Sequence, residues 1–165
     1  MSILNISDVA LMVIDCDGVL TDNRVWVNEN GSESVAFSRA DGLAFNALHK
    51  LKVKTVIMST EANKVVDQRG KKLKVDVLQN VTCKKSALQS LIEDHNLRAK
   101  DVVYVGNDVN DFHAMIMCGT SFCPNDAHQL IKKSATFSLS TNGGHGVIRE
   151  ILETHFNINL LKTLY

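Results

Sequence analysis

Two aspartates on either side of a cysteine, Asp15-Cys16-Asp17, follow the first apolar run of the chain. Carboxylates at this spacing can divide the work of group transfer, because one can attack a substrate while the other moves a proton. The same short pattern is common in calcium sites and in turns. The pair alone therefore leaves an enzyme and a simple binding site as alternatives.

More polar residues follow the later apolar runs. A serine and a threonine come after 55–58, a lysine comes before a predicted helix, and an amide and two carboxylates come after 102–105. Each has a simpler explanation when taken alone, as a helix cap or a solvated surface charge. These residues are Ser59, Thr60, Lys84, Asn107, Asp108 and Asp111.

The elements that must position these residues alternate along the chain. The runs 10–14, 55–58 and 102–105 are unbroken apolar stretches, typical of strands buried on both faces of a parallel sheet. Between them, 43–51 and 87–92 carry apolar residues at helical spacing, and a short helix is predicted at 115–118 before Gly119. Alternation of this kind predicts a three-layer, Rossmann-like α/β sandwich with right-handed crossovers.

Ligands of an open parallel sheet bind beyond the carboxyl ends of its strands. We therefore expect the aspartates, the hydroxyl groups and Lys84 to meet at one edge of the sheet. Carboxylates, a hydroxyl and a lysine in one place are what phosphoryl transfer through a covalent aspartyl-phosphate requires.

Two segments interrupt the alternation. Residues 24–27 and 34–37 flank the polar stretch 28–31 and predict a β-hairpin. A glycine-rich loop at 141–146 precedes a predicted final helix, 147–156. The sequence has no repeat and no linker-like stretch, so we expect residues 1–165 to form a single domain without an inserted cap or lid.

The composition excludes several classes of function. Lys plus Arg and Asp plus Glu both number 18, so no global field would recruit nucleic acid or an anionic membrane. The apolar runs are too short to span a bilayer. The four cysteines lack the spacing of a zinc site, which favours a reduced, cytoplasmic protein.

The motifs together resemble the haloacid dehalogenase superfamily. The segment Asp15-Cys16-Asp17-Gly18-Val19-Leu20-Thr21-Asp22 is similar to its D-x-D-G-x-x-T-D signature, and later residues match its other three motifs: Ser59, Lys84 and 106–111. This resemblance implies that Asp15 attacks phosphorus and that Asp17 protonates the leaving alcohol and then activates water. It also implies that Ser59 and Lys84 hold the phosphoryl oxygens.

The same resemblance implies a Mg²⁺ cofactor. The expected ligands are Asp15, the Asp17 backbone carbonyl and the fourth-motif residues Asn107, Asp108 and Asp111. Asn107 departs from the family pattern, which usually has aspartate there. An amide oxygen can still bind Mg²⁺, but the site then carries one negative charge fewer.

The hairpin, the tail 143–150 and the segment Asp126-Ala127-His128 resemble one capless subfamily. It contains phosphatases of 3-deoxy-D-manno-octulosonate 8-phosphate, phosphatases of nonulosonate 9-phosphates, and domains fused to acylneuraminate cytidylyltransferases. The resemblance implies a homotetramer in which each hairpin closes over a neighbour's active site. A site without a lid needs such a cover against water.

Residues of the second motif, of the helix that follows it and of the tail are the candidates for recognising the sugar: Thr60, Glu61, Arg69, Lys72, Gly144 and Arg149. Ser59-Thr60-Glu61 stands where octulosonate phosphatases usually have Thr-Gly-Arg, which favours a sialic-acid-like nonulosonate 9-phosphate. An octulosonate 8-phosphate is the alternative substrate. A different class of function is a weakly active module that oligomerises an associated cytidylyltransferase.

Overall fold

Six parallel strands form one sheet in the computed structural model, which describes residues 4–165. Their order across the sheet is β5-β4-β1-β6-β7-β8, so the first strand of the chain lies inside the sheet. The strands are β1 (Leu11–Asp15), β4 (Lys54–Met58), β5 (Asp76–Leu78), β6 (Val102–Val105), β7 (Thr120–Cys123) and β8 (Phe137–Ser138). This arrangement confirms the α/β sandwich predicted from the sequence.

Strand β1 shows why the sheet needs a helical layer on each face. All five of its residues are buried. Met12 and Ile14 belong to one hydrophobic cluster, while Leu11 and Val13 belong to the other. Because successive side chains of a strand point to opposite faces, an unbroken apolar run is what two-sided burial requires.

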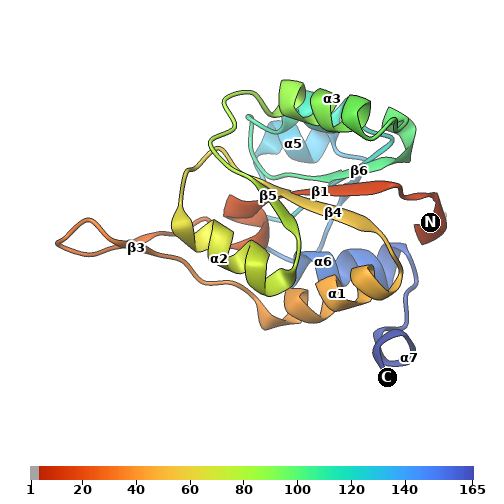
Figure 1. Cartoon of the computed structure of the whole chain (residues 1–165), viewed down its shortest axis with the longest axis horizontal. Helices are drawn as coiled ribbons and strands as arrows, with labels where there is room; N and C mark the ends of the chain where they lie inside the picture. Colours follow the sequence, from red (N-terminus) through yellow and green to blue (C-terminus); the bar gives the residue numbers. More distant parts are fainter. Residues whose placement is uncertain (1–3) are drawn as a thin grey trace.

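The helices divide between these two clusters, as Figure 1 shows. One layer covers the face of Met12 and consists of α1 (Arg39–Lys50), α2 (Lys64–Leu73), α6 (Val147–Glu150) and α7 (Leu160–Leu164). The opposite layer consists of α3 (Lys84–Asp94), α4 (Phe112–Met115) and α5 (Gln129–Ser134). None of the helices in residues 4–165 is long and apolar enough to cross a membrane.

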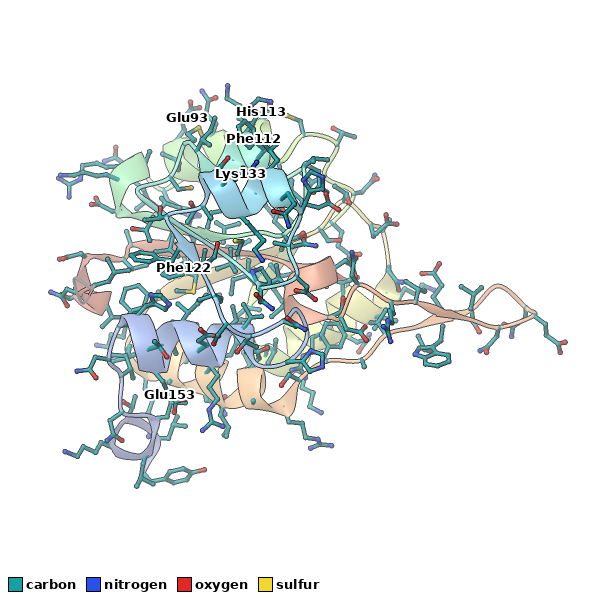
Figure 2. All side chains as sticks on the ribbon, turned by 180° about the vertical axis from the view of Figure 1, so that it is seen from behind. Glu93, Phe112, His113, Phe122, Lys133 and Glu153 are labelled. Atoms are coloured by element: carbon teal, nitrogen blue, oxygen red, sulfur yellow. The ribbon has the colours of Figure 1, made fainter. Side chains whose placement is uncertain are left out.

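Aromatic side chains pack where strands β7 and β8 meet the segment that follows α6. Figure 2 shows Phe122 inside the molecule, whereas Glu93, Lys133 and Glu153 lie on its outside. The Phe122 ring lies 5.2 Å from the ring of Phe137 and 5.0 Å from that of His155. These contacts fix the segment after α6 against β7 and β8.

The segment between β1 and α1 projects as a hairpin, visible at one end of the molecule in Figures 1 and 2. Its strands are β2 (Trp26–Val27) and β3 (Glu33–Ser34), paired antiparallel as Trp26 with Ser34 and Val27 with Glu33. The hairpin is confirmed, although its ladder is shorter than the predicted pairing of 24–27 with 34–37. Trp26 is 72% exposed, so the hairpin packs little of its apolar surface against its own chain.

Asp41 joins the first helix to the start of α6. It is buried, and its Oδ1 accepts hydrogen bonds from the backbone N–H groups of Ile148 at 2.8 Å and Arg149 at 3.2 Å. Burial raises the pKa of this carboxyl group to about 6. These hydrogen bonds therefore anchor the start of α6 to α1, and with it the end of the glycine-rich loop that precedes α6.

The helix expected at 115–118 is displaced. The structure places α4 at Phe112–Met115, and Gly119 lies directly before β7. The glycine is needed for close packing, because a Cβ atom there would lie 2.0 Å from the carbonyl oxygen of Lys100. Contact between two distant segments, and not the end of a helix, explains this residue.

Candidate active site

Strand β1 ends at Asp15, and the chain then turns sharply through 16–20. Gly18 has a φ of 82°, a conformation that glycine adopts without strain. The Thr21 hydroxyl accepts a hydrogen bond from the Gly18 N–H at 3.3 Å and donates one to Asp17 Oδ1 at 3.4 Å. The turn therefore presents both aspartates beyond the carboxyl end of the strand, as the sequence predicts.

Lys84, the first residue of α3, lies between two buried carboxylates. Its Nζ is 2.7 Å from Asp15 Oδ1 and 2.6 Å from Asp111 Oδ1, and all three side chains are buried. Burial disfavours the charged amine, but the two carboxylates outweigh this effect and raise the pKa of Lys84. Burial and Asp111 raise the pKa of Asp15, and Lys84 opposes them.

Asp111 has a different environment from the one expected of a metal ligand. Its Oδ1 accepts hydrogen bonds from Lys84 and from the Tyr104 hydroxyl, and its Oδ2 accepts from the backbone N–H groups of Asn107 and Asp108. Four donors fill the lone pairs of a carboxylate. In this structure Asp111 therefore orients Lys84 and the turn after β6, and its role as a direct metal ligand stays a prediction.

Three oxygen atoms converge beside the nucleophile position without a hydrogen atom between them. The side-chain oxygen of Asn107 lies 2.9 Å from the Asp17 carbonyl oxygen and 3.0 Å from Asp15 Oδ2. Rotation of the amide would instead let its NH₂ group donate to both atoms. In the orientation shown, a cation bound among the three acceptors would satisfy them, whereas the rotated amide satisfies them by hydrogen bonds alone.

The spacing of this oxygen cluster suits a small divalent cation. Ligands bound to octahedral Mg²⁺ at 2.0–2.1 Å lie about 2.9 Å from one another. No group of three His, Cys, Asp or Glu side chains in residues 4–165 is arranged to hold a metal, because two of these oxygens come from an amide and a backbone carbonyl. The residues present therefore fit Mg²⁺. Asp108 lines the pocket and accepts the N–H of Val109 at 2.7 Å.

Gly18 is required at this point for space as well as for its φ angle. A Cβ atom there would lie 1.9 Å from the side-chain nitrogen of Asn107. Any larger residue would push that amide out of the oxygen cluster.

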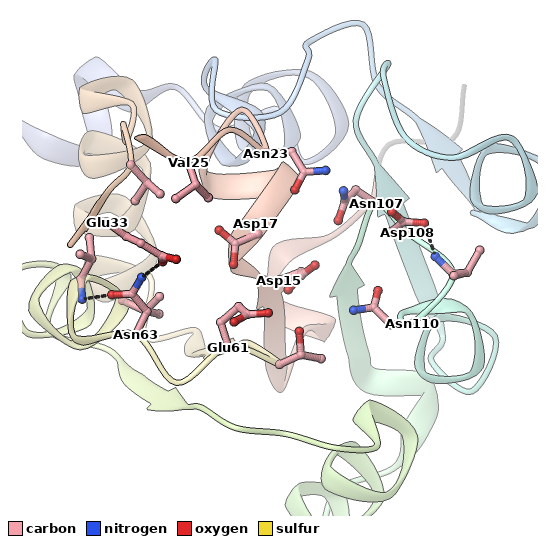
Figure 3. Close-up of a pocket in the computed structure, with 15 residues that line it drawn as sticks. Asp15, Asp17, Asn23, Val25, Glu33, Glu61, Asn63, Asn107, Asp108 and Asn110 are labelled. Atoms are coloured by element: carbon pink, nitrogen blue, oxygen red, sulfur yellow. Dashed lines mark hydrogen bonds between the residues drawn. The ribbon is translucent and has the colours of Figure 1, made fainter. Parts of the chain in front are cut away.

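The residues after β4 form another wall of the site. Ser59 is buried, and its hydroxyl accepts the Glu61 N–H at 3.1 Å. Thr60 and Glu61 line a pocket of about 590 Å³ that includes both aspartates. Figure 3 shows Asp15, Asp17 and Asn107 facing the same space as Glu61.

The opposite wall links the hairpin to α2. Asn63 caps α2 by accepting the Val65 N–H at 2.9 Å, and its amide NH₂ donates to Glu33 at 2.9 Å (Figure 3). Neither Asn63 nor Glu33 was predicted from the sequence, since only the folded hairpin brings them together. The hydrogen bond of Tyr104 to the site was not predicted either, because a tyrosine in an apolar strand indicates only that the residue is buried.

The pocket lining contains no lysine or arginine, and several carboxylates face it. Burial raises the pKa of Asp17 above its ordinary value, Glu61 and Glu33 raise it further, and Thr21 and Lys84 oppose them. A raised pKa favours the protonated form that a general acid needs. Cys16, between the two aspartates, is fully buried, and that burial raises the pKa of its thiol.

Four residues expected to contact the substrate lie outside this pocket. Arg69 donates to the Ser38 carbonyl at 2.8 Å and lies 5.0 Å over the Phe37 ring. Lys72 is exposed on α2. Within one chain, therefore, α2 directs neither basic group into the cavity.

The two tail residues have structural partners. Arg149 pairs with Glu153 on the outer side of α6 at 3.0 Å. Gly144 packs on the turn after β1, where its N–H donates to the Val19 carbonyl at 2.9 Å. A Cβ atom on Gly144 would lie 2.6 Å from the Asp22 nitrogen, so this glycine permits close packing of the tail on the catalytic turn.

Comparison with known proteins bears on this constellation. A family described as haloacid dehalogenase-like hydrolase matches residues 43–151. The match covers the serine, lysine and asparagine motifs, whereas Asp15 and Asp17 lie before it. The chain belongs to the haloacid dehalogenase-like hydrolases.

Individual relatives extend the similarity over most of the chain. The 3-deoxy-D-manno-octulosonate 8-phosphate phosphatase of Salmonella typhi is 30% identical over 147 residues, which cover 88% of this chain and 78% of that protein. A solved structure of the phosphatase of that name from Moraxella catarrhalis, in complex with magnesium, phosphate and KDO, has a TM-score of 0.87 and 26% identity. It covers 96% of this chain and 88% of its own.

A third similar protein is a HAD family hydrolase structure from Streptomyces avermitilis, with a TM-score of 0.89 and 37% identity. It covers 92% of this chain and 87% of its own. These haloacid dehalogenase-like neighbours share the parallel sheet described above, which supports the fold predicted from the sequence.

Replacing Lys84 with methionine should leave Asp15 and Asp111 buried without their cation. We expect the free energy of unfolding to fall by about 3–5 kcal/mol near neutral pH, because breaking a buried ion pair strands its partner. The deficit should shrink in acid, where the carboxylates can take up protons. Urea denaturation followed by circular dichroism measures the effect.

Lys85→Met is the matched control for this substitution, since Lys85 is the exposed neighbour on the same helix. Its free energy of unfolding should change by less than about 0.5 kcal/mol. Equal losses in the two variants would show that Lys84 is not a stabilising centre of the site.

Proposed function

We propose that the protein is a Mg²⁺-dependent phosphatase that hydrolyses a 2-keto-3-deoxy sugar acid phosphate. The observation that carries this proposal is the placement of Asp15. One of its oxygens accepts from Lys84, and the other belongs to the three-oxygen cluster with Asn107 and the Asp17 carbonyl. A carboxylate held between a fixed ammonium group and a cation site is suited to attack a phosphate dianion.

Mg²⁺ held by Asp15, the Asp17 carbonyl and Asn107 would supply positive charge to neutralise the phosphoryl oxygens. The magnesium in the Moraxella catarrhalis structure supports this choice of metal. The roles of the protein groups follow from their positions. Asp111 would keep Lys84 oriented.

The reaction would proceed in two displacements at phosphorus. Asp15 attacks, the bond from phosphorus to the leaving oxygen breaks, and Asp17 gives its proton to the departing alcohol. The resulting aspartyl-phosphate is then attacked by water, from which Asp17 takes a proton, and phosphate leaves with Asp15 restored. Lys84 and Ser59 would bind the phosphoryl oxygens during both steps.

Within sugar acid phosphates, we favour a nonulosonate 9-phosphate. Glu61 supports this choice because it lines the pocket, where the second motif of octulosonate enzymes usually has an arginine. The names of the curated relatives favour the alternative, an octulosonate 8-phosphate. In either case the acidic lining of one chain is suited to hydroxyl groups, so the substrate carboxylate needs cations from elsewhere.

A neighbouring subunit is the source we propose for those cations. The exposed hairpin with Trp26 and Val27, together with Arg69 and Lys72 on α2, would meet a second copy in a homotetramer. The hairpin then covers the neighbour's pocket and takes the place of a lid.

Phosphate release with Mg²⁺ tests the proposed activity on both sugar acid phosphates. Replacing Asp15 with asparagine should lower kcat by more than about 10³-fold, because the nucleophile is lost. Asp94→Asn, which removes an exposed carboxylate at the end of α3, is the control and should remain active. If the wild type releases no more phosphate than Asp15→Asn on either substrate, the phosphatase hypothesis is wrong. The hypothesis of a module that oligomerises a cytidylyltransferase then takes its place.

Replacing Asn107 with aspartate should tighten Mg²⁺ binding by about tenfold, because it adds a negative charge to the oxygen cluster. Isothermal titration of metal-free protein with MgCl₂ measures the dissociation constant. Asn110→Asp adds the same charge to the pocket lining outside the cluster and should give a smaller gain. Equal affinity in the wild type and Asn107→Asp would remove Asn107 from the metal ligands.

Light scattering measures the assembly. We expect a mass of four times the 18.2 kDa chain, and a smaller species when Trp26 is replaced by glutamate, since a charge there would oppose burial of the hairpin. A fully active monomer at working concentration would contradict the tetramer and the shared active site.

A further inference from the structure

We infer that residues 126–128, which we name the bridging segment, set the spacing of the three-oxygen cluster and thereby select Mg²⁺ over larger cations. The inference rests on the proposed function, because it concerns the metal site of that same reaction. The bridging segment bonds the backbone of Asn107 directly and reaches the turn after β1 through Gly143, while contributing no atom to the cluster. Its residues are therefore positioning residues.

One contact reaches the half of the cluster that comes from β6. The backbone N–H of His128 donates to the carbonyl oxygen of Asn107 at 2.8 Å. Asn107 supplies the amide oxygen of the cluster, so this bond holds the main chain from which that side chain extends. Asp111 holds the same residue from the other side by accepting its N–H at 2.9 Å.

A second contact reaches the half that comes from β1 indirectly, through the glycine-rich loop. Asp126 Oδ1 accepts the backbone N–H of Gly143 at 2.9 Å. Gly143 lies directly on the catalytic turn, because a Cβ atom there would be 2.2 Å from the Gly18 carbonyl oxygen. The adjoining residue Gly144 donates to the Val19 carbonyl, so the loop is hydrogen-bonded to the same turn.

The turn in question carries the second oxygen of the cluster. The Asp17 carbonyl belongs to the peptide bond that joins Asp17 to Gly18. Displacement of Gly143 would therefore move that carbonyl relative to the Asn107 amide, from which it lies 2.9 Å. Asp126 and His128 are only two residues apart in the chain. Together they connect the segment that carries the Asn107 amide to the turn that carries the Asp17 carbonyl.

The cluster has little stiffness of its own. Two of its three oxygens come from a backbone turn and a neutral amide, and without a cation the amide can rotate and donate to the other two atoms. The backbone around the cluster must therefore fix the spacing that a cation meets. Ca²⁺ accepts ligands at 2.3–2.6 Å in flexible arrangements, whereas Mg²⁺ requires 2.0–2.1 Å in near-ideal geometry. Loss of the bridge should consequently weaken Mg²⁺ more than Ca²⁺. Partners that orient metal ligands from outside typically change metal affinity by about 10–100-fold.

Calorimetric titration of metal-free protein with MgCl₂ and, separately, CaCl₂ tests the inference. Asp126→Ala should weaken Mg²⁺ binding by about tenfold and lower the ratio of Mg²⁺ to Ca²⁺ affinity. Asp126→Asn keeps an acceptor oxygen for Gly143 and should restore most of both. Asn125→Ala is the control, because Asn125 bonds the side chain of Asn142 in the same loop but not Gly143.

The contact at the other end of the bridging segment, from the His128 N–H to Asn107, can be removed by a proline substitution. His128 has a φ of −54°, which proline can adopt, so His128→Pro removes the N–H that bonds Asn107. It should bind Mg²⁺ more weakly than His128→Ala, which keeps that N–H and loses only the imidazole. This pair also decides the matter if Asp126→Ala does not fold, which the thermal unfolding midpoint of metal-free protein reveals.

The outcomes separate the two levels of the proposal. Wild-type protein that binds no Mg²⁺ would overturn the proposed metal-dependent function. Wild-type protein that binds Mg²⁺, with Asp126→Ala and His128→Pro binding as tightly and with the same Mg²⁺ to Ca²⁺ ratio, would overturn the bridging role alone. A ratio that falls equally in Asn125→Ala would also overturn it, because the effect would then belong to the loop as a whole.

Discussion

The contact of Lys84 with Asp15 and Asp111 is the interaction on which the rest of the site depends. An ammonium group and two carboxylates at 2.6–2.7 Å are buried together, and such groups are costly to remove from water unless their geometry is nearly complete. Completing it requires the end of β1, the turn after β6 and the first residue of α3 to meet. Tyr104 and two backbone N–H groups supply the remaining hydrogen bonds.

Much of the fold could be predicted because strands buried on both faces leave unbroken apolar runs. Placing polar residues at their carboxyl ends was enough to bring Asp15, Asp17, Ser59 and Lys84 to one edge. The hydrogen bonds of Asp111 could not be predicted, because motif spacing does not show which donors will occupy its two carboxylate oxygens. The contact of Arg69 with the Ser38 carbonyl could not be predicted either, because the two residues are 31 positions apart in the chain.

The pocket of a single chain lacks the cations that both ends of the proposed substrate would require. Its lining offers carboxylates and amides but no lysine or arginine, while the proposed substrate carries a phosphate and a carboxylate. Lys84 and a divalent cation would balance only the phosphate end. The hydrogen bond between Glu33 and Asn63 fixes the hairpin at the rim, so the position of the pocket wall is coupled to that of the exposed hairpin.

Cys16 shows how burial can separate two neighbouring nucleophiles. A thiol is intrinsically the more reactive group, yet this one points into the core, and the aspartates beside it disfavour its thiolate further. In the proposed reaction the carboxylate is thus the group that would be phosphorylated, and burial shields the Cys16 thiol from electrophiles and oxidants in the solvent. Cys83, exposed beside Lys84 and with a lowered pKa, would be alkylated first. The reactive centre is thus protected by the direction of one side chain in a turn.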